Sequence, residues 1–421
     1  MENIETVADK NENSGKVGQK MSEREVVIVD GARSAFGTLG GGLRYLNGTD
    51  IGGFVVKGLV EKTKIVECTK VDSVFAGSSL ADGQTRTQTR YLTQLAGLPI
   101  DVSGIYVEMQ GGSSLACINH AAWKIKAGMA DVVIAGGMES YSRTPAMLST
   151  ANVPYRALSP APLKRAFSPE SDRDLDIYAL SDRTAAKWKI SREGCDEYTM
   201  RSQELLKKAY ADGITGDEII PYTTPAGGGR AAVLADKDEV PEAEKSREYL
   251  QKLAAVHEDG VTTEGNIACM SDGAAFLLIM TAEKASELGY KPFARWIGGA
   301  HIGIREENMG FGAAYSSLKA LDQSKLKLSD LDVIECNEFS AAQSLGVKRE
   351  METEWGEDID INIWNPNGGA LAIGNPSGAS GARTALSAMK QLEKISGRYG
   401  LCSASCRGGQ GASILIENLR I

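Results

Sequence analysis

Three glycine-rich segments are the parts of the sequence whose residue types and spacing could do chemistry on a ligand. They are EMQGGSSL (108–115), NPNGGALAIGNPSGASG (365–381) and SCRGGQGA (405–412). Helical patterns follow the first two, so backbone N–H groups at these helix starts can point toward a bound anion. Such donors hold a phosphate or stabilise an oxyanion, and glycine lets a ligand come close to the backbone. A single turn of this kind more often serves only close packing, but three together favour a shared ligand site.

The elements that must position these turns alternate between strand and helix patterns. EVVIVDGA (25–32) is an apolar run typical of a buried strand. Further strands are predicted at 72–77, 105–109, 131–135 and from 271, and helices at 50–62, 86–97, 113–127 and from about Gly378. This alternation predicts an α/β protein whose parallel strands are joined by helical crossovers.

The stretch from 141 to 270 interrupts this alternation. It opens with a segment rich in proline and serine and continues with charged helical stretches near 179–187 and 192–211. We interpret it as an inserted loop domain, where ligand contacts often lie. Around it, GAAFLLIM (273–280) and GASILIEN (411–418) close two similar runs of strands and helices, which indicates an internal duplication.

Four parts follow from these patterns. Residues 1–20 are polar and are predicted to form a disordered tail. Residues 21–140 together with 271–290 make one half, 141–270 make the loop domain, and 291–421 make the other half.

Composition limits the classes of partner. A net charge of −9 argues against nucleic acid and anionic membranes, and no apolar run is long enough to span a bilayer. The seven cysteines form no CxxC pair, which is typical of a reduced, cytoplasmic protein. The sequence contains three histidines and no cluster with metal-ligand spacing, so we expect no metal.

Several motifs together resemble the thiolase superfamily. They are DGARSAFGTLGG (30–41), AGGMESYS (135–142), CNEFSAAQ (336–343), NPNGGALAIGNPSGASGAR (365–383) and GGQGASILIEN (408–418), and they occur in family order. The resemblance implies a five-layered αβαβα fold of two similar halves with an inserted loop domain. It also implies a homodimer or tetramer that binds coenzyme A (CoA) thioesters as substrate or ligand, holds no permanent cofactor, and belongs to the acyl-CoA C-acyltransferases.

The family's catalytic residues carry over poorly. Counting back from GGMES without a gap places Gly111 where the family has its nucleophilic cysteine, and Asn375 stands in place of its histidine. Ser405 stands in place of the second cysteine, the acid/base group, although a slip of one residue would put Cys406 there. Of the four usual site residues, only the asparagine is kept, as Asn337.

The ligand-binding positions also depart from the family. Asp176 aligns with a pantetheine-contacting histidine and Ala268 with a small serine, while Arg407, in the motif of the acid/base cysteine, stands in place of a glycine. Lys245 and Arg247 are the local candidates for a CoA phosphate, although a charged run such as theirs usually covers a solvated helix face.

These substitutions remove the acyl acceptor but leave hydrogen-bond donors in place. Asn375 can offer an amide N–H, Asn337 can hold a water, and the Gly111 amide lies at a helix start. Ser405 would be a poor base, and the Cys406 side chain should face the other side of its strand.

Two interpretations follow. In the first, the protein is an enzyme that makes or breaks carbon–carbon bonds by Claisen or aldol chemistry without an acyl-cysteine, within a complex. In the second, it is a non-catalytic subunit that binds a CoA ester or supports an active homologue. Some thiolase relatives that act on aryl-substituted succinyl-CoA esters, such as the benzoylsuccinyl-CoA type, work with a small zinc-ribbon or OB-type subunit. No residue of this chain identifies such a partner.

Overall fold

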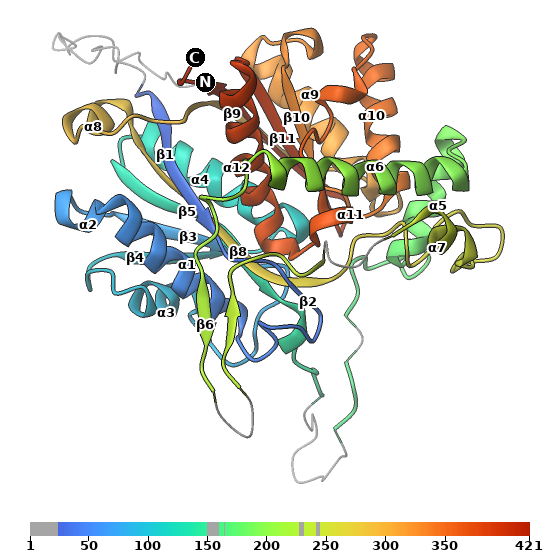
Figure 1. Ribbon diagram of the computed structural model, residues 1–421, viewed down its shortest axis with the longest axis horizontal. Helices are drawn as coiled ribbons and strands as arrows, with labels where there is room; N and C mark the ends of the chain where they lie inside the picture. Colours follow the sequence, from blue (N-terminus) through green and yellow to red (C-terminus); the bar gives the residue numbers. More distant parts are fainter. Residues whose placement is uncertain (1–23, 150–159, 164, 227–230, 241–244) are drawn as a thin grey trace, which may run out of the picture.

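The computed structural model describes residues 24–149, 160–163, 165–226, 231–240 and 245–421. The tail predicted at 1–20 lies outside these residues. Two α/β halves lie side by side, with the N-terminal half in blue to teal apart from its yellow segment 271–287, and the C-terminal half in orange to red (Figure 1).

The N-terminal half is built around five strands of a mixed sheet. In spatial order they are β4 (Ser103–Val107), β3 (Ser73–Gly77), β5 (Val132–Ser140), β8 (Ser271–Thr281) and β1 (Val26–Arg33). The short β2 (Gly37–Thr38) pairs with β8. The helices of this half are α1 (Gly48–Thr63), α2 (Ile65–Cys68), α3 (Gln88–Leu95), α4 (Ser113–Lys126) and α8 (Ala282–Glu287). The apolar runs of β5 and β8 are buried at every position, as strands covered on both faces require.

The C-terminal half repeats this arrangement. Its strands are β10 (Val333–Cys336), β11 (Tyr399–Cys406), β12 (Gln410–Asn418) and β9 (Ala294–Gly303), in that spatial order. Its helices are α9 (Gly312–Ser324), α10 (Ala341–Trp355), α11 (Ala370–Ile373) and α12 (Ser377–Ile395). In both halves one parallel pairing is followed by two antiparallel ones: β3–β5–β8–β1 in the first and β10–β11–β12–β9 in the second.

The layers follow from how the helices cover the sheets. Helices α4 and α12 pack between the two halves and contact strands of both, while α1 covers the outer face of one half and α9 that of the other. Three large apolar clusters fill the spaces between these layers. The central one contains Leu115 and Leu386, and the two outer ones contain Val55 in the N-terminal half and Leu321 in the C-terminal half. The five-layered αβαβα expectation is therefore confirmed, because these helices and sheets alternate in that order.

The two sheets meet at a narrow seam. Strands β1 and β9 are antiparallel and pair through Val27 with Arg295 and Ile28 with Ala294. Backbone pairing across the halves is thus short, and most of their contact comes from the helices of the central layer.

The proposed insertion carries the remaining elements. They are α5 (Ile177–Trp188), α6 (Arg192–Ala211), β6 (Tyr222–Thr224), β7 (Val233–Ala235) and α7 (Arg247–Lys252). The two predicted helical stretches correspond to α5 and α6, and the short strands form a separate hairpin that projects from the molecule (Figure 1). Within the described part of the chain, no helix combines the length and apolar character needed to cross a membrane.

Candidate active site

A cavity of about 620 Å³ lies where the three glycine turns and the insertion meet. Four of the predicted site residues line it together, namely Gly111, Asn337, Asn375 and Ser405. Leu39, Met309 and Phe339 add apolar surface to its wall. The volume falls within the range of small-molecule sites, and polar groups converge on one part of an otherwise largely apolar wall.

Gly111 sits in a short 3₁₀ turn, Gln110–Gly112, directly before α4. A Cβ atom placed on Gly111 would lie 3.2 Å from the Ser405 carbonyl oxygen and 4.0 Å from Asn337 Nδ2. The missing side chain would therefore point at the other predicted site residues. The N-cap residue Gly112 offers α4 no side-chain cap, and the exposed Glu108 accepts from the backbone N and the Nε2 of Gln110. The Gly111 side of this turn can therefore face a ligand.

Asn337 and Asn375 face each other across the cavity wall. Asn337 Nδ2 lies 3.4 Å from Asn375 Oδ1, which also accepts a hydrogen bond from Ser380 Oγ at 2.7 Å. Asn337 is buried and its Oδ1 has no partner among the described residues. A buried acceptor without a partner costs free energy, so Oδ1 is suited to hold a water or a substrate N–H or O–H group.

Ser405 and Cys406 point to opposite faces of β11, as strand alternation predicts. The Ser405 hydroxyl accepts from Ala313 N and donates to Gly310 O, both at 2.9 Å, so it anchors the start of α9. Cys406 is fully buried in the central layer, and a Cβ on Gly112 would meet its Sγ at 2.5 Å. Burial raises the pKa of Cys406 to about 12, which keeps the thiol protonated. Cys406 is therefore not part of the cavity lining.

Buried carboxylates hold the turns around the cavity. Glu139 accepts from Ser78 Oγ, Ser79 N and Gly378 N at 2.9, 2.8 and 3.1 Å, and it also contacts Ser79 Oγ. Glu338 accepts from Tyr198 Oη, Asn365 Nδ2 and Leu371 N at 2.7, 2.7 and 3.1 Å. Both are completely or almost completely buried, and each joins segments far apart in the sequence.

The residues predicted to contact CoA are dispersed. Ala268 lines the cavity. Asp176 instead caps α5 by accepting from Tyr178 N and Ala179 N, and Arg247 is half-exposed and pairs with a glutamate on α6 at 3.4 Å. Lys245 is buried, and its Nζ donates to Leu371 O at 3.3 Å. Lys245 is therefore a buried residue that joins the insertion to α11, and it does not lie on the solvated helix face suggested by its charged neighbours.

Several cavity residues were not singled out from the sequence. They include Gln110, Tyr141, Phe167, Tyr178, Glu264 and Cys269. Tyr141 Oη bonds Ser377 Oγ at 2.8 Å, and burial raises the pKa of Tyr141 to about 12, so this phenol is a donor at neutral pH. Cys269 follows Ala268 directly, and its carbonyl accepts from Asn375 N at 2.9 Å. The position of Cys269 next to Ala268, which was a predicted CoA contact, could have identified it from the sequence.

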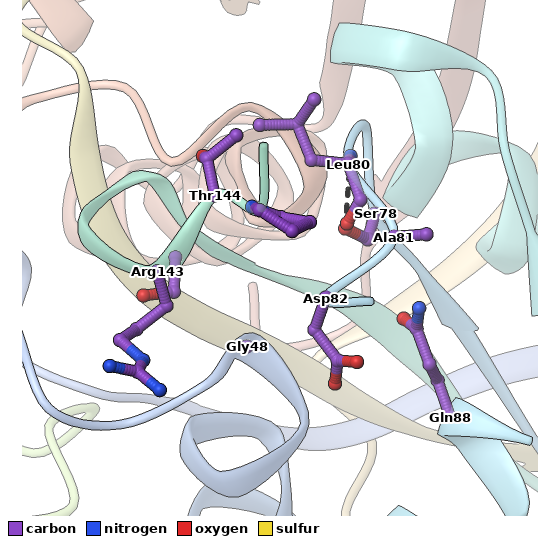
Figure 2. A pocket seen from close by; sticks show the side chains of 10 residues that line it. Gly48, Ser78, Leu80, Ala81, Asp82, Gln88, Arg143 and Thr144 are labelled. Atoms are coloured by element: carbon purple, nitrogen blue, oxygen red, sulfur yellow. Dashed lines mark hydrogen bonds between the residues drawn. The ribbon is translucent and has the colours of Figure 1, made fainter. Parts of the chain in front are cut away.

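A second hollow lies beside the cavity and shares Leu80 with it. Figure 2 shows Asp82 and Arg143 near Gly48, the first residue of α1. The interior of this second hollow measures about 10 Å³, which is room for one water. Asp82 is already engaged by Thr49 Oγ1 at 2.6 Å and by two backbone amides. This hollow therefore cannot take an acyl group.

The fold and the cavity define an α/β protein of two duplicated halves with a shared site between them. The chain belongs to the thiolase family, since residues 26–283 match the thiolase N-terminal domain and residues 290–418 match the thiolase C-terminal domain.

Individual relatives match nearly the whole chain. The beta-ketoadipyl-CoA thiolase of Acinetobacter baylyi is 36% identical over 411 residues, covering 94% of this chain and 100% of the relative. The crystal structure of the Bacillus anthracis acetyl-CoA acetyltransferase superposes with a TM-score of 0.87 at 31% identity, covering 94% of this chain and 99% of that one. Human mitochondrial 3-ketoacyl-CoA thiolase in complex with CoA gives a TM-score of 0.83 at 29% identity, covering 94% and 98%.

Proposed function

We propose that this protein acts on a CoA thioester and makes or breaks a carbon–carbon bond without forming an acyl-cysteine. The observation that carries the proposal is Gly111 at the wall of the cavity, facing Ser405 O and Asn337 Nδ2. The cavity has polar groups and room for a ligand, and Gly111, the position predicted for the acyl acceptor, has no side chain. A β-ketoacyl thioester is the substrate class that the name of the Acinetobacter relative supports.

In the cleavage direction, the chemistry needs one addition and one bond scission. The thiol of a second CoA adds to the β-keto carbonyl of the bound thioester, and its proton leaves to solvent. The resulting oxyanion re-forms a carbonyl as the C2–C3 bond breaks, and the electron pair passes to the thioester enolate. Protonation at C2 then gives two acyl-CoA products. The reverse sequence is a Claisen condensation, and an aldol-type cleavage would place the same demand on the site.

The residues of the cavity have distinct roles in this proposal. The Gly111 amide at the start of α4 and Nδ2 of Asn375 stabilise the developing oxyanion. Oδ1 of Asn337, which has no partner within the described chain, holds the water that exchanges the proton at C2. Ser405 acts as a positioning residue because its hydroxyl is engaged by the start of α9.

The proposed assembly and CoA contacts extend the site. We place the pantetheine arm along Ala268, with Asp176, Lys245 and Arg247 as further CoA-contact candidates. The protein would work as a homodimer or tetramer, or as a hetero-oligomer with a zinc-ribbon or OB-type subunit.

The test is a product assay on the purified protein. We expect a β-ketoacyl-CoA incubated with CoA to yield two acyl-CoA products, measured by liquid chromatography with mass detection. Asn375→Ala should lower the rate about 100-fold, the usual cost of one oxyanion donor. Asn362→Ala, the same substitution at an exposed position outside the cavity lining, serves as the control. Turnover unaffected by Asn375→Ala would contradict the assigned role.

A non-catalytic role is the second candidate. It is favoured by one observation: no histidine lines the cavity in the described part of the chain. Calorimetry with CoA and CoA esters separates the two. Binding without turnover, together with a stoichiometric partner that carries an intact nucleophile, would favour the non-catalytic subunit. Absence of any binding would favour a structural subunit.

A further inference from the structure

Arg407 brings a positive charge into the cavity at a position where the family pattern has glycine. It is the first residue after β11, in the turn to β12. Gly408 and Gly409 follow with φ of 81° and 73°, a left-handed backbone that favours glycine. This tight turn places Arg407 in the cavity lining together with Gly111 and Asn375.

The guanidinium of Arg407 is held from one side only. It stacks over the ring of Phe167 at 3.8 Å from the ring centre, and its Nη2 donates to Leu175 O at 2.9 Å. Its Nε is buried and has no hydrogen-bond partner among the residues that the structure describes. None of the ion pairs within the described residues includes Arg407. The insertion therefore orients the side chain, and Nη1, which makes no hydrogen bond in the described part of the chain, is the donor left for a ligand.

Nearby carboxylates do not neutralise this charge directly. Asp174 and Asp176 favour the charged form at longer range, but Asp174 accepts from Phe167 N and Asp176 caps α5 and contacts His257. Desolvation by burial lowers the pKa of Arg407, although a guanidinium stays protonated at working pH. Glu264 is the other charged residue of the described cavity lining and forms no ion pair with it.

A partly desolvated guanidinium with unused donors, stacked on an aromatic ring, is the arrangement that recognises a carboxylate or a phosphate. The charge stands in a wall that is otherwise largely apolar, with Met309, Phe339 and Ile177 among the neighbours. An acyl chain that starts at Gly111 and Asn375 runs within this cavity, so Arg407 is placed to meet a group on that chain.

We propose that the acyl group of the substrate carries a carboxylate, and that Arg407 binds it. This inference rests on the proposed function, because it assumes that the cavity takes a CoA thioester. Arg407 is then the residue that selects a dicarboxylic acyl group over a neutral one of equal length. The same chemistry would fit a phosphate of CoA itself, so the experiment must separate the two anions.

The experiment measures binding of non-hydrolysable CoA thioethers by calorimetry. Each pair has the same chain length and ends either in a carboxylate or in a methyl group, and CoA alone is the third ligand. The wild-type chain is compared with Arg407→Met, which keeps an unbranched apolar stem but removes the guanidinium, and with Arg407→Lys. Arg305→Met is the matched control, because Arg305 is 70% exposed and lies outside the lining.

We expect the wild type to bind the carboxylate-ended ligand about 10 to 100 times more tightly than its methyl-ended partner, as a charge-assisted contact implies. Arg407→Met should bring this ratio to about one, and Arg407→Lys should give an intermediate ratio. The affinity for CoA and for the methyl-ended ligand should stay the same in all variants.

Two results would overturn the inference. Equal binding of the paired ligands by the wild type would show that the cavity does not read a carboxylate. A parallel loss of affinity for CoA and both thioethers in Arg407→Met would instead assign Arg407 to a CoA phosphate. If the wild type binds no ligand at all, including CoA, the proposed function itself fails, and this outcome is distinct from the other two.

Discussion

The two helices of the central layer both begin in glycine turns, but the carboxylates that meet these turns differ between them. At α12, Gly378 N is satisfied by the buried carboxylate of Glu139, and Glu335 pairs with Arg383 farther along the same helix at 3.2 Å. At α4, Gly111 lines the cavity, and the carboxylate in this turn is that of the exposed Glu108, which accepts from Gln110 N at 2.9 Å. Figure 1 shows both helices between the two halves. The start of α12 is thus closed by a buried carboxylate, whereas the turn before α4 carries an exposed one and leaves Gly111 open to a ligand.

The strongest test of this difference restores a side chain at the open helix. Gly111→Cys puts a thiol at the start of α4, where the 3.2 Å approach to Ser405 O requires a shift of only a few tenths of an ångström. A thiol at a helix N-terminus has a lowered pKa, so it should react with an acyl-CoA. We expect intact-mass spectrometry to detect an acyl adduct on this variant and none on the wild type or on Gly111→Ala. An adduct on the wild type would show that another residue captures the acyl group.

The next test removes the anion from the closed helix. Glu139→Ala leaves Gly378 N and Ser79 N without their buried acceptor, and we expect the free energy of unfolding to fall by about 3 kcal/mol. Glu139→Gln keeps one acceptor oxygen and should lose roughly half as much. Denaturant unfolding measures both values. A loss below about 1 kcal/mol for the alanine variant would mean that water replaces the carboxylate.

The third test uses pH to follow the second anchor of α12. Burial, opposed by Arg383, raises the pKa of Glu335 to about 7 from its ordinary 4.5. The folded state then holds a proton that the unfolded state has lost. This contribution to the free energy of unfolding is therefore largest below about pH 4.5. It falls by at most about 3 kcal/mol as the pH rises to about 7, and it is constant above that pH.

Glu335→Gln should remove this component of the pH dependence. Other buried carboxylates, Glu139 among them, also have raised pKa values, so part of the slope should remain. The measurement is the difference between the two unfolding profiles from pH 4.5 to 7.5. Parallel profiles would mean that Glu335 keeps the same charge over this range.

The smallest expected effect concerns Cys269, which lines the cavity beside the open helix, whereas Cys68 is exposed elsewhere. A CoA ester at ten times its dissociation constant should slow alkylation of Cys269 about tenfold, because only the free protein reacts. Alkylation of Cys68 should keep its rate and serves as the internal control. Peptide mapping after timed treatment with N-ethylmaleimide gives both rates, and equal protection of the two thiols would argue against binding at this cavity.

The sequence predicted the parts of the site that depend on local periodicity. The helix expected at 113–127 is α4, Ser113–Lys126, and strand alternation correctly separates Ser405 from Cys406. The convergence of the three glycine turns was also predicted, from their number and the duplicated halves, although the first follows the parallel strand β4 and the third joins the antiparallel strands β11 and β12.

The sequence could not predict the side-chain positions that depend on contacts made by the insertion. Lys245 and Asp176 lie in charged stretches whose pattern cannot distinguish a ligand contact from a buried anchor or a helix cap. The orientation of Arg407 depends on Phe167 and Leu175, which are far away in the chain. Positions of this kind are set by tertiary packing, which no local pattern encodes.

The short seam between β1 and β9 has a consequence for how the chain can be divided. Only two residue pairs join the sheets, yet the first half packs its inner face against α12, an element that the chain supplies near its C-terminus. A fragment that stops before β9 would keep α4 on the inner face of its sheet but would expose to water the apolar surface that α12 covers. Separately produced halves should therefore aggregate alone and regain structure only when mixed. Each half thus depends on the other for folding, although the two are similar.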